Sequence, residues 1–134
     1  MSERGQQLAQ ELQMMESYYS DILKQESMLS TTLKYVADSI DSLRAFDMPE
    51  LEVFAPLGPG IHVKAKIKQD DKILVDVGTG MAIEKDRDAA LSYLEMRIKT
   101  LTVGLREVTT KKQSVVDSME NMRHEAANLA TQKS

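Results

Sequence analysis

Apolar residues recur at alternating spacings of four and three along the first third of the chain. From Leu8 to Leu43 the series continues without a slip for about five heptads, and Glu26 is its one polar member. A repeat of about 3.5 residues kept over this length is typical of a coiled-coil seam rather than of a short amphipathic helix. The series consists of Leu8, Leu12, Met15, Tyr19, Ile22, Glu26, Leu29, Leu33, Val36, Ile40 and Leu43.

A second series of the same kind occupies the last third of the chain, and Lys112 alone breaks it. Asp86 is expected to cap the N-terminus of this helix, and Asp88 is favourable in its first turn. Two helices of more than roughly 40 residues each would be about 60 to 70 Å long. The series consists of Leu91, Leu94, Ile98, Leu101, Leu105, Val108, Lys112, Val115, Met119, Met122, Ala126 and Leu129.

Between the two series the apolar period changes to about two residues, which indicates β-strands. Turn residues separate the alternating stretches, and in the first turn Gly58 and Gly60 are expected to supply the geometry. We therefore predict two hairpins in succession. The expected strands are residues 51–57, 61–67, 73–77 and 81–83, and the expected turns are Gly58-Pro59-Gly60, Gln69-Asp70-Asp71 and Gly78-Thr79-Gly80.

These patterns predict an α+β fold, a long antiparallel two-helix coiled coil with two β-hairpins between the helices. The N-terminal helix is expected at residues 1–46, the hairpin cassette at 47–84 and the C-terminal helix at 85–134, all within one structural unit. Isolated hairpins are marginal in water and leave open edges, so their apolar face should recruit strands from other chains. The residues expected to form this oligomer contact are Val53, Ile61, Val63, Ala65, Ile67, Ile73, Val75 and Val77.

The antiparallel arrangement also predicts which residues face one another. If Leu43 faces Leu91, the seam positions Leu8, Met15 and Ile22 lie near Ala126, Met119 and Lys112, respectively. Glu26 then falls about one helical turn from Lys112. The two polar breaks are therefore predicted to form a single ion pair between the helices.

Composition narrows the class of protein further. The chain has 134 residues with nine Met, no Trp and 28% charged residues, which suits long helices better than a compact globule. A net charge of −4 argues against nucleic-acid binding, which depends on cations that neutralise phosphates. The absence of Cys excludes disulfides and thiolate chemistry. No apolar run reaches the roughly 20 residues of a membrane span, so we predict a cytoplasmic protein.

Candidate chemistry is sparse. Neither glycine turn has the Walker or dinucleotide-binding pattern, so no phosphate loop is expected. The two histidines, His62 and His124, have no convergent ligands, so we predict no metal and no cofactor. The lysines that share a strand face with His62 form either a docking patch for an acidic partner or, as we favour, the solvated side of a sheet. The charges at 84–88 are interpreted as a helix start, and no enzyme is predicted.

Several short motifs resemble the alpha class of prefoldin, most closely its archaeal form. The order helix, two hairpins, helix matches over essentially the whole chain, although Thr79 and Pro59 depart from the usual turn residues. The motifs are Pro56-Leu57-Gly58-Pro59-Gly60, Val63-Lys64-Ala65, the stretch from Ile73 to Gly80, Glu84-Lys85 and Ala89-Ala90.

This resemblance implies a hexamer of two alpha and four beta subunits. Its hairpins would form a double β-barrel platform from which the coiled coils hang as tentacles. The assembly would capture unfolded polypeptides at the tentacle tips and deliver them to a group II chaperonin without nucleotide.

The ends of the arms are the expected client-binding sites, because flexible, polarizable Met side chains pack against varied apolar surfaces. For Met15, Met119 and Met122, simple filling of the seam is an equally good interpretation. The alternative function is a prefoldin-like structural subunit that forms filaments, and a third, a nuclease or transcription accessory, is disfavoured. The expected client-binding residues are Leu8, Leu12, Met14, Met15, Tyr18, Tyr19, Met119, Met122, Ala126 and Leu129.

Overall fold

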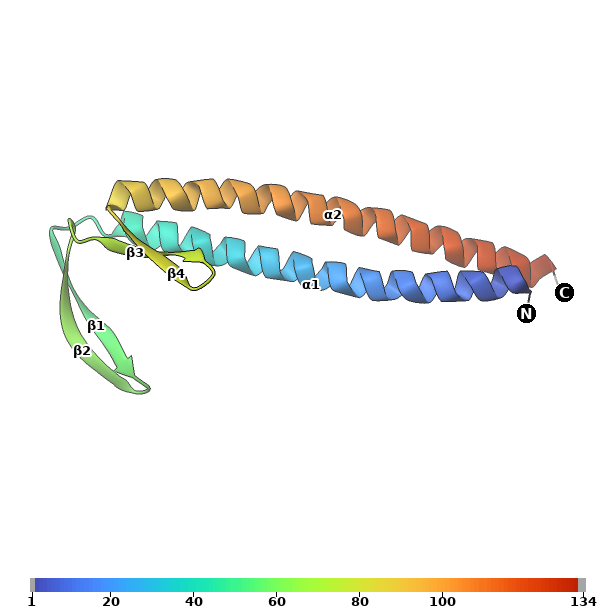
Figure 1. The fold of residues 1–134 in the computed structure, drawn as a ribbon, viewed down its shortest axis with the longest axis horizontal. Coiled ribbons are helices and arrows are strands. Elements are labelled where there is room, and N and C mark those ends of the chain that lie inside the picture. Colours follow the sequence, from blue (N-terminus) through green and yellow to red (C-terminus); the bar gives the residue numbers. More distant parts are fainter. Residues whose placement is uncertain (1, 133–134) are drawn as a thin grey trace. The chain divides into compact units, whose positions relative to one another are not determined.

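The computed structural model describes residues 2–132, and it contains two long helices with two β-hairpins between them (Figure 1). The α+β fold expected from the hydrophobic pattern is confirmed. The elements are α1 (Glu3–Ala45), β1 (Glu50–Gly58), β2 (Ile61–Lys68), β3 (Ile73–Gly78), β4 (Met81–Lys85) and α2 (Arg87–Gln132).

The chain divides into two compact units. The arm unit contains the described residues up to Leu33 and from Thr100 onward, and the hairpin unit contains Lys34–Lys99. In the arm unit the two helices run antiparallel, because residues early in α1 contact residues late in α2. Their seam is built from the two apolar series. Its buried cluster is Ile22, Val108, Val115 and Met119, with Leu12, Met15, Tyr19 and Leu29 packed against it.

The hairpin unit begins and ends with helical segments that are fixed to each other. Arg87 donates a hydrogen bond of 2.7 Å to the carbonyl oxygen of Phe46, and Arg44 pairs with Glu95 at 2.6 Å. The expected cap on α2 is confirmed, because the Asp86 carboxylate accepts a hydrogen bond of 2.8 Å from the backbone N–H of Ala89. The contacts of Arg87 and Arg44 join the end of α1 to the start of α2, where the hairpin segment leaves and returns.

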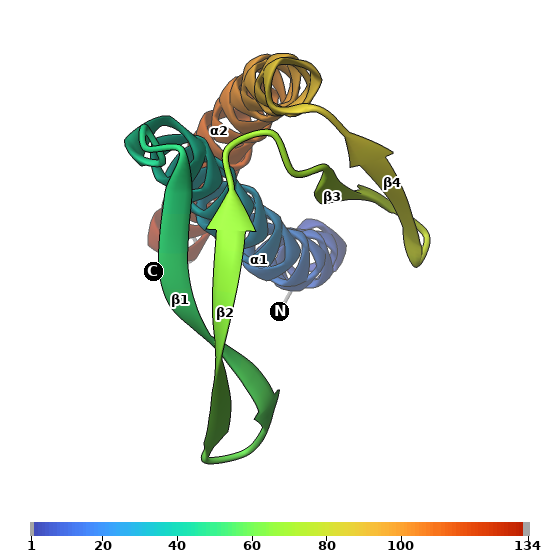
Figure 2. The ribbon, with the colours of Figure 1, turned by 90° about the vertical axis from the view of Figure 1, so that its left-hand side faces the viewer.

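The hairpins form two separate antiparallel sheets, β1–β2 and β3–β4 (Figure 2). In the first turn only Gly60 has a positive φ, of 74°, so the expectation that Gly58 shares the turn geometry was wrong. Gly58 lies instead beside a β-bulge. In the turn of the second hairpin, between β3 and β4, both Thr79 and Gly80 have a positive φ, 53° and 74°, which is the pattern of a type I′ turn.

Candidate protein-interaction surfaces

One face of the β1–β2 hairpin is apolar and still partly open to solvent. The register places Val53 opposite Ala65 and Ala55 opposite Val63 on this face. Val53 and Ala65 are half-buried, whereas Val63 is 45% exposed. Ile61, which follows the turn, is also exposed. A two-stranded sheet with an open apolar face is marginal alone, so this face is a candidate contact with other chains.

The β3–β4 hairpin has a similar apolar face, and this face is more buried within the chain than the apolar face of β1–β2. Val75 pairs with Ile83 in the register, and Val75 is buried within this chain. Ile73 and Val77, on the same face, are half-buried, whereas Ile83 and Met81 are exposed. Of the residues expected at the oligomer contact, Val75 therefore has an intrachain packing role already. The remaining ones keep surface that another chain can cover.

The second face of β1–β2 carries charge. Lys66 and Glu50 lie 3.9 Å apart on it, and both side chains are largely exposed. The cross-strand neighbours on this face are Glu50 and Lys68, Glu52 and Lys66, Phe54 and Lys64, and Pro56 and His62. The sequence pattern predicts the lysines here but assigns no role to Phe54. The feature of the sequence that could have singled out Phe54 is its position, because a large apolar residue stands where the alternation otherwise places polar ones.

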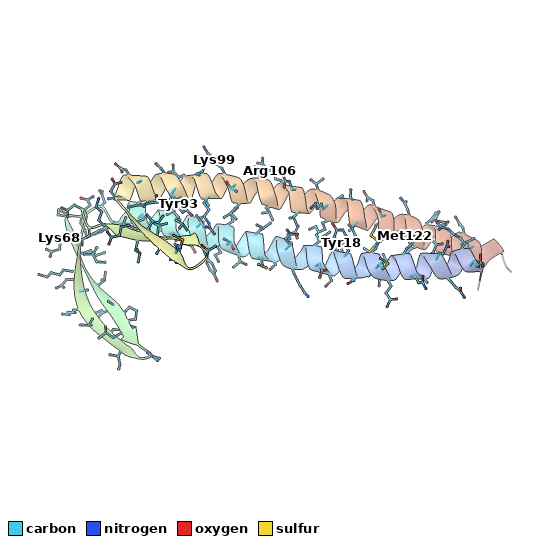
Figure 3. The ribbon with its side chains drawn as sticks, in the orientation of Figure 1. Tyr18, Lys68, Tyr93, Lys99, Arg106 and Met122 are labelled. Atoms are coloured by element: carbon cyan, nitrogen blue, oxygen red, sulfur yellow. The ribbon has the colours of Figure 1, made fainter. Side chains whose placement is uncertain are left out.

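The expected client-binding residues differ widely in exposure. Leu8 and Met119 are buried in the seam. Met14 is 73% exposed, and Tyr18 and Ala126 are also exposed. Figure 3 shows Tyr18 on α1 and Met122 on α2. The half-buried members are Leu12, Met15, Tyr19, Met122 and Leu129.

Met28 is a further exposed methionine of the arm unit, with 70% of its surface accessible. The heptad pattern places it off the seam, but it is not among the expected client-binding residues. Its signal is the same as that of Met14, a large apolar side chain outside the 3.5-residue repeat. Exposure of both methionines on one helix extends the apolar surface of α1 away from its N-terminal turns.

The polar break in the seam is a three-residue contact. Lys112 Nζ lies 2.9 Å from Glu26 Oε2, and Thr109 donates a hydrogen bond of 3.2 Å to the same oxygen. The predicted ion pair between the two helices is therefore confirmed. An open groove of about 370 Å³ lies beside it. The groove is lined by Leu23, Glu26, Ser27, Ser30, Thr31, Leu105 and Thr109.

Two carboxylates of the arm unit are tuned by their partners across the helices. The hydrogen bond from Lys112 lowers the pKa of Glu26, and the hydrogen bonds from Arg4 lower the pKa of Glu125. Arg4 binds Glu125 through two nitrogens, at 2.8 and 3.1 Å, and its own pKa is raised. A third cross-helix pair joins Arg123 and Glu16 at 3.4 Å. The charged forms of Glu26, Glu125 and Arg4 are thus favoured in the folded arm.

Neither a metal centre nor a membrane span emerges from the described residues. Within 2–132, His, Asp and Glu do not gather in a group that could hold a metal ion. No helix in the same range is long and apolar enough to cross a membrane.

Two long helices paired across an antiparallel seam, with two hairpins between them, define a class of coiled-coil subunits with a β-hairpin cassette. A family model described as Prefoldin, prefoldin subunit, matches residues 8–132. The chain belongs to the prefoldin family, which confirms the resemblance drawn from its turn and strand motifs. Membership supports a general role as a chaperone subunit, and prefoldin subunits assemble into oligomers with one another.

Named relatives and solved structures agree with this assignment. The chain is 32% identical to prefoldin subunit alpha of Nitrosopumilus maritimus over 95% of its own length and 88% of the relative's. It is 27% identical to prefoldin subunit alpha of Pyrococcus horikoshii, covering 93% and 84%.

Among solved structures, filamentous prefoldin from Methanocaldococcus jannaschii superposes with a TM-score of 0.71, at 21% identity, over 87% of this chain and 98% of that one. The prefoldin beta subunit of Thermococcus strain KS-1 superposes with a TM-score of 0.69, at 14% identity, over 96% and 93%. At these identities the two likenesses concern the fold.

Proposed function

We propose that this chain is the alpha-type subunit of an ATP-independent holdase. Two copies join four beta subunits, capture unfolded polypeptides at the arm ends and deliver them to a group II chaperonin. The observation that carries the proposal is the open apolar face of the hairpins, above all Val63 and Ile61, in a chain whose arm has buried its own seam. A subunit built this way is complete in its arm and incomplete in its platform.

Assembly through the hairpins follows from the physics of small sheets. Each two-stranded sheet has open edges and one apolar face, and strands from neighbouring subunits would satisfy both in a closed β-barrel platform. Val53, Ala65 and Ile67 in β1–β2 would turn inward together with Ile73 and Val77 in β3–β4. The charged alternate residues would then face solvent.

Client binding is assigned to the free ends of the arms. Met14 and Tyr18 are exposed there, and they offer flexible and aromatic apolar surface to an unfolded chain. Leu8 and Met119 are buried in the folded arm, so they can contribute only when the end of the coiled coil frays. Each contact is weak, and several arms acting on one client supply the avidity.

The test uses the protein assembled with a beta-type subunit. Mass measurement should give a closed hexamer on mixing, and the hexamer should suppress aggregation of a denatured client without ATP. Removing residues 1–14 and 120–134 from this chain should leave the hexamer intact and weaken suppression, because the arms of both copies then lack their ends. A hexamer that keeps full suppression after this truncation would contradict binding at the arm ends.

A filament-forming subunit is the second candidate, and the fold likeness to filamentous prefoldin favours it. In that case strand contacts between cassettes would continue without closing. The mass of the protein alone separates the two functions. Open-ended growth without a beta-type subunit supports the filament, and a closed hexamer that forms only on mixing supports the holdase.

A further inference from the structure

The polar faces of the two hairpins carry the same motif with opposite charge. On β1–β2, Phe54 lies across from Lys64, and on β3–β4, Leu74 lies across from Glu84. Phe54 is 66% exposed and Leu74 is 67% exposed. Each face thus presents one large apolar side chain directly beside one charge, and the charge is a cation on one hairpin and an anion on the other.

The neighbouring positions sharpen this difference. On β1–β2, Glu50 and Glu52 have lysines across the strand, whereas Lys64 has Phe54. On β3–β4, Asp76 has Ala82 across the strand and Glu84 has Leu74, so no cation stands opposite either carboxylate. The turn-proximal half of the β1–β2 polar face is therefore positive, and the polar face of β3–β4 is negative.

These faces stay available in the assembly proposed above. Successive side chains of a strand point to opposite faces, so burying Val63 and Val75 in a shared platform turns Lys64 and Asp76 outward. The inference therefore rests on the proposed function, which supplies the closed particles that it joins. A large apolar side chain at the centre of an outward face, beside a charge, is the composition of a small protein-binding site.

We propose that the polar face of β1–β2 in one assembled particle docks on the polar face of β3–β4 in another copy of this chain. Phe54 packs against Leu74, while Lys64 lies against Glu84 and Asp76. The two surfaces differ, so the contact is heterologous and can link closed particles into larger arrays. It differs from a filament of open cassettes because it joins particles whose barrels are already closed.

Salt dependence shows whether the attraction between the two charged faces is stronger than the general repulsion between particles of like net charge. The chain carries a net charge of −4, and repulsion between whole particles would weaken their association at low salt. Attraction between Lys64 and the two carboxylates would do the opposite. Between about 0.01 M and 1 M salt the Debye length falls from about 30 Å to about 3 Å, so the direction of the change shows whether attraction or repulsion is stronger.

The experiment measures the association of particles formed with a beta-type subunit, by sedimentation over a range of concentrations at low and high salt. Wild-type particles should associate more strongly at low salt. Lys64→Glu and Glu84→Lys should each weaken association by roughly tenfold or more, because like charges then face each other. The double exchange Lys64→Glu with Glu84→Lys should restore it. Lys72→Glu, the same charge change in the loop between the hairpins, should have little effect.

Phe54→Ser and Leu74→Ser test the apolar half of the contact and should weaken association at both salt concentrations. Particles that form normally but do not associate at low salt would overturn this inference and leave the proposed function intact. The inference is equally overturned if Lys64→Glu and Lys72→Glu behave alike, or if the double exchange restores nothing. If no closed particle forms with a beta-type subunit, the proposed function fails, and the inference fails with it because it joins such particles.

Discussion

The arm unit and the hairpins contain similar apolar residues, but the arm unit buries them within the chain and the hairpins leave several of them exposed. In the arm unit, Ile22 is 2% exposed and packs in a seam that the same chain completes. In the β1–β2 hairpin, Val63 occupies an equally regular apolar position and remains 45% exposed. Both patterns are amphipathic, but a helix pair supplies its own second surface and a two-stranded sheet does not.

Charge shows the same division. In the arm unit Glu26, Glu125 and Glu16 each pair with a cation on the opposite helix of the same chain. On β3–β4, Asp76 and Glu84 have no cation across the strand. These arm carboxylates thus find their partners within one polypeptide, whereas the hairpins keep both apolar and charged groups exposed. This difference predicts that the two regions respond differently to substitution.

The largest effect should come from a charge placed on the apolar face of the β1–β2 hairpin. Val63→Asp places a carboxylate where the platform would bury a side chain, and an unpaired charge is not tolerated in such a contact. We expect assembly with a beta-type subunit to be lost, as measured by mass. The thermal unfolding of the isolated chain, followed by far-UV circular dichroism, should change little because helices dominate that signal.

The matched control is His62→Asp, one residue earlier on β2 and on the opposite face of the strand. It should leave the mass of the particle unchanged. If both variants assembled, the apolar face of β1–β2 would not be the assembly surface.

The second largest effect should come from the arm. Ile22→Ala removes buried methylene groups from the centre of the seam and should cost about 2–4 kcal/mol of unfolding free energy. Met14→Ala, on the same helix but 73% exposed, should change stability by no more than about 0.5 kcal/mol. Denaturant unfolding of both variants checks the difference. Equal losses would mean that the exposed flank and the seam contribute alike, against the comparison.

Much of the arm was predictable because both helices of the pair, and therefore both surfaces of the seam, belong to the same sequence. Glu26 and Lys112 each break an apolar series, and the antiparallel return of the chain brings the two breaks together. The cap at Asp86 was predictable from residue type and position. These features depend on local spacing and on one connection, so a single sequence contains what they require.

The hairpins were predictable as strands but not as surfaces. Alternation separates Val63 from Lys64, yet exposure depends on what covers each face, and a two-stranded sheet has no second layer of its own that the sequence pattern could identify. Alternation also assigns Phe54 and Leu74 to the polar faces, but it does not explain why large apolar residues stand there. The turn residues located the first turn correctly. Which of Gly58 and Gly60 adopts a positive φ depends on a bulge that composition does not reveal.

A smaller effect is expected at the second hairpin turn. Thr79 is β-branched and has a φ of 53°, a region that such residues rarely adopt. Thr79→Asn should stabilise the assembled particle by about 1 kcal/mol, because Asn-Gly suits a type I′ turn. Thermal unfolding of the assembled particle measures the gain. Thr110→Asn in α2 is the control, and a gain of equal size there would show that the turn is not the cause.

The smallest effect should be the pH dependence of the arm. Lys112 lowers the pKa of Glu26, and Arg4 lowers that of Glu125, so the unfolded chain binds protons at a higher pH than the folded arm does. The resulting stabilisation is complete above the ordinary Glu pKa of about 4.3 and is lost as the pH falls through the lowered values. Stability of the wild-type arm should therefore decline in acid.

Glu26→Gln removes one of these groups, so its unfolding free energy should fall less steeply in acid, while at neutral pH it should cost less than Ile22→Ala. Glu107→Gln removes an exposed carboxylate elsewhere on α2 and should keep the wild-type slope. Denaturant midpoints over the acid range provide the measurement. Identical slopes for Glu26→Gln and the wild type would mean that the pair of Glu26 and Lys112 adds nothing to the pH dependence of the arm's stability.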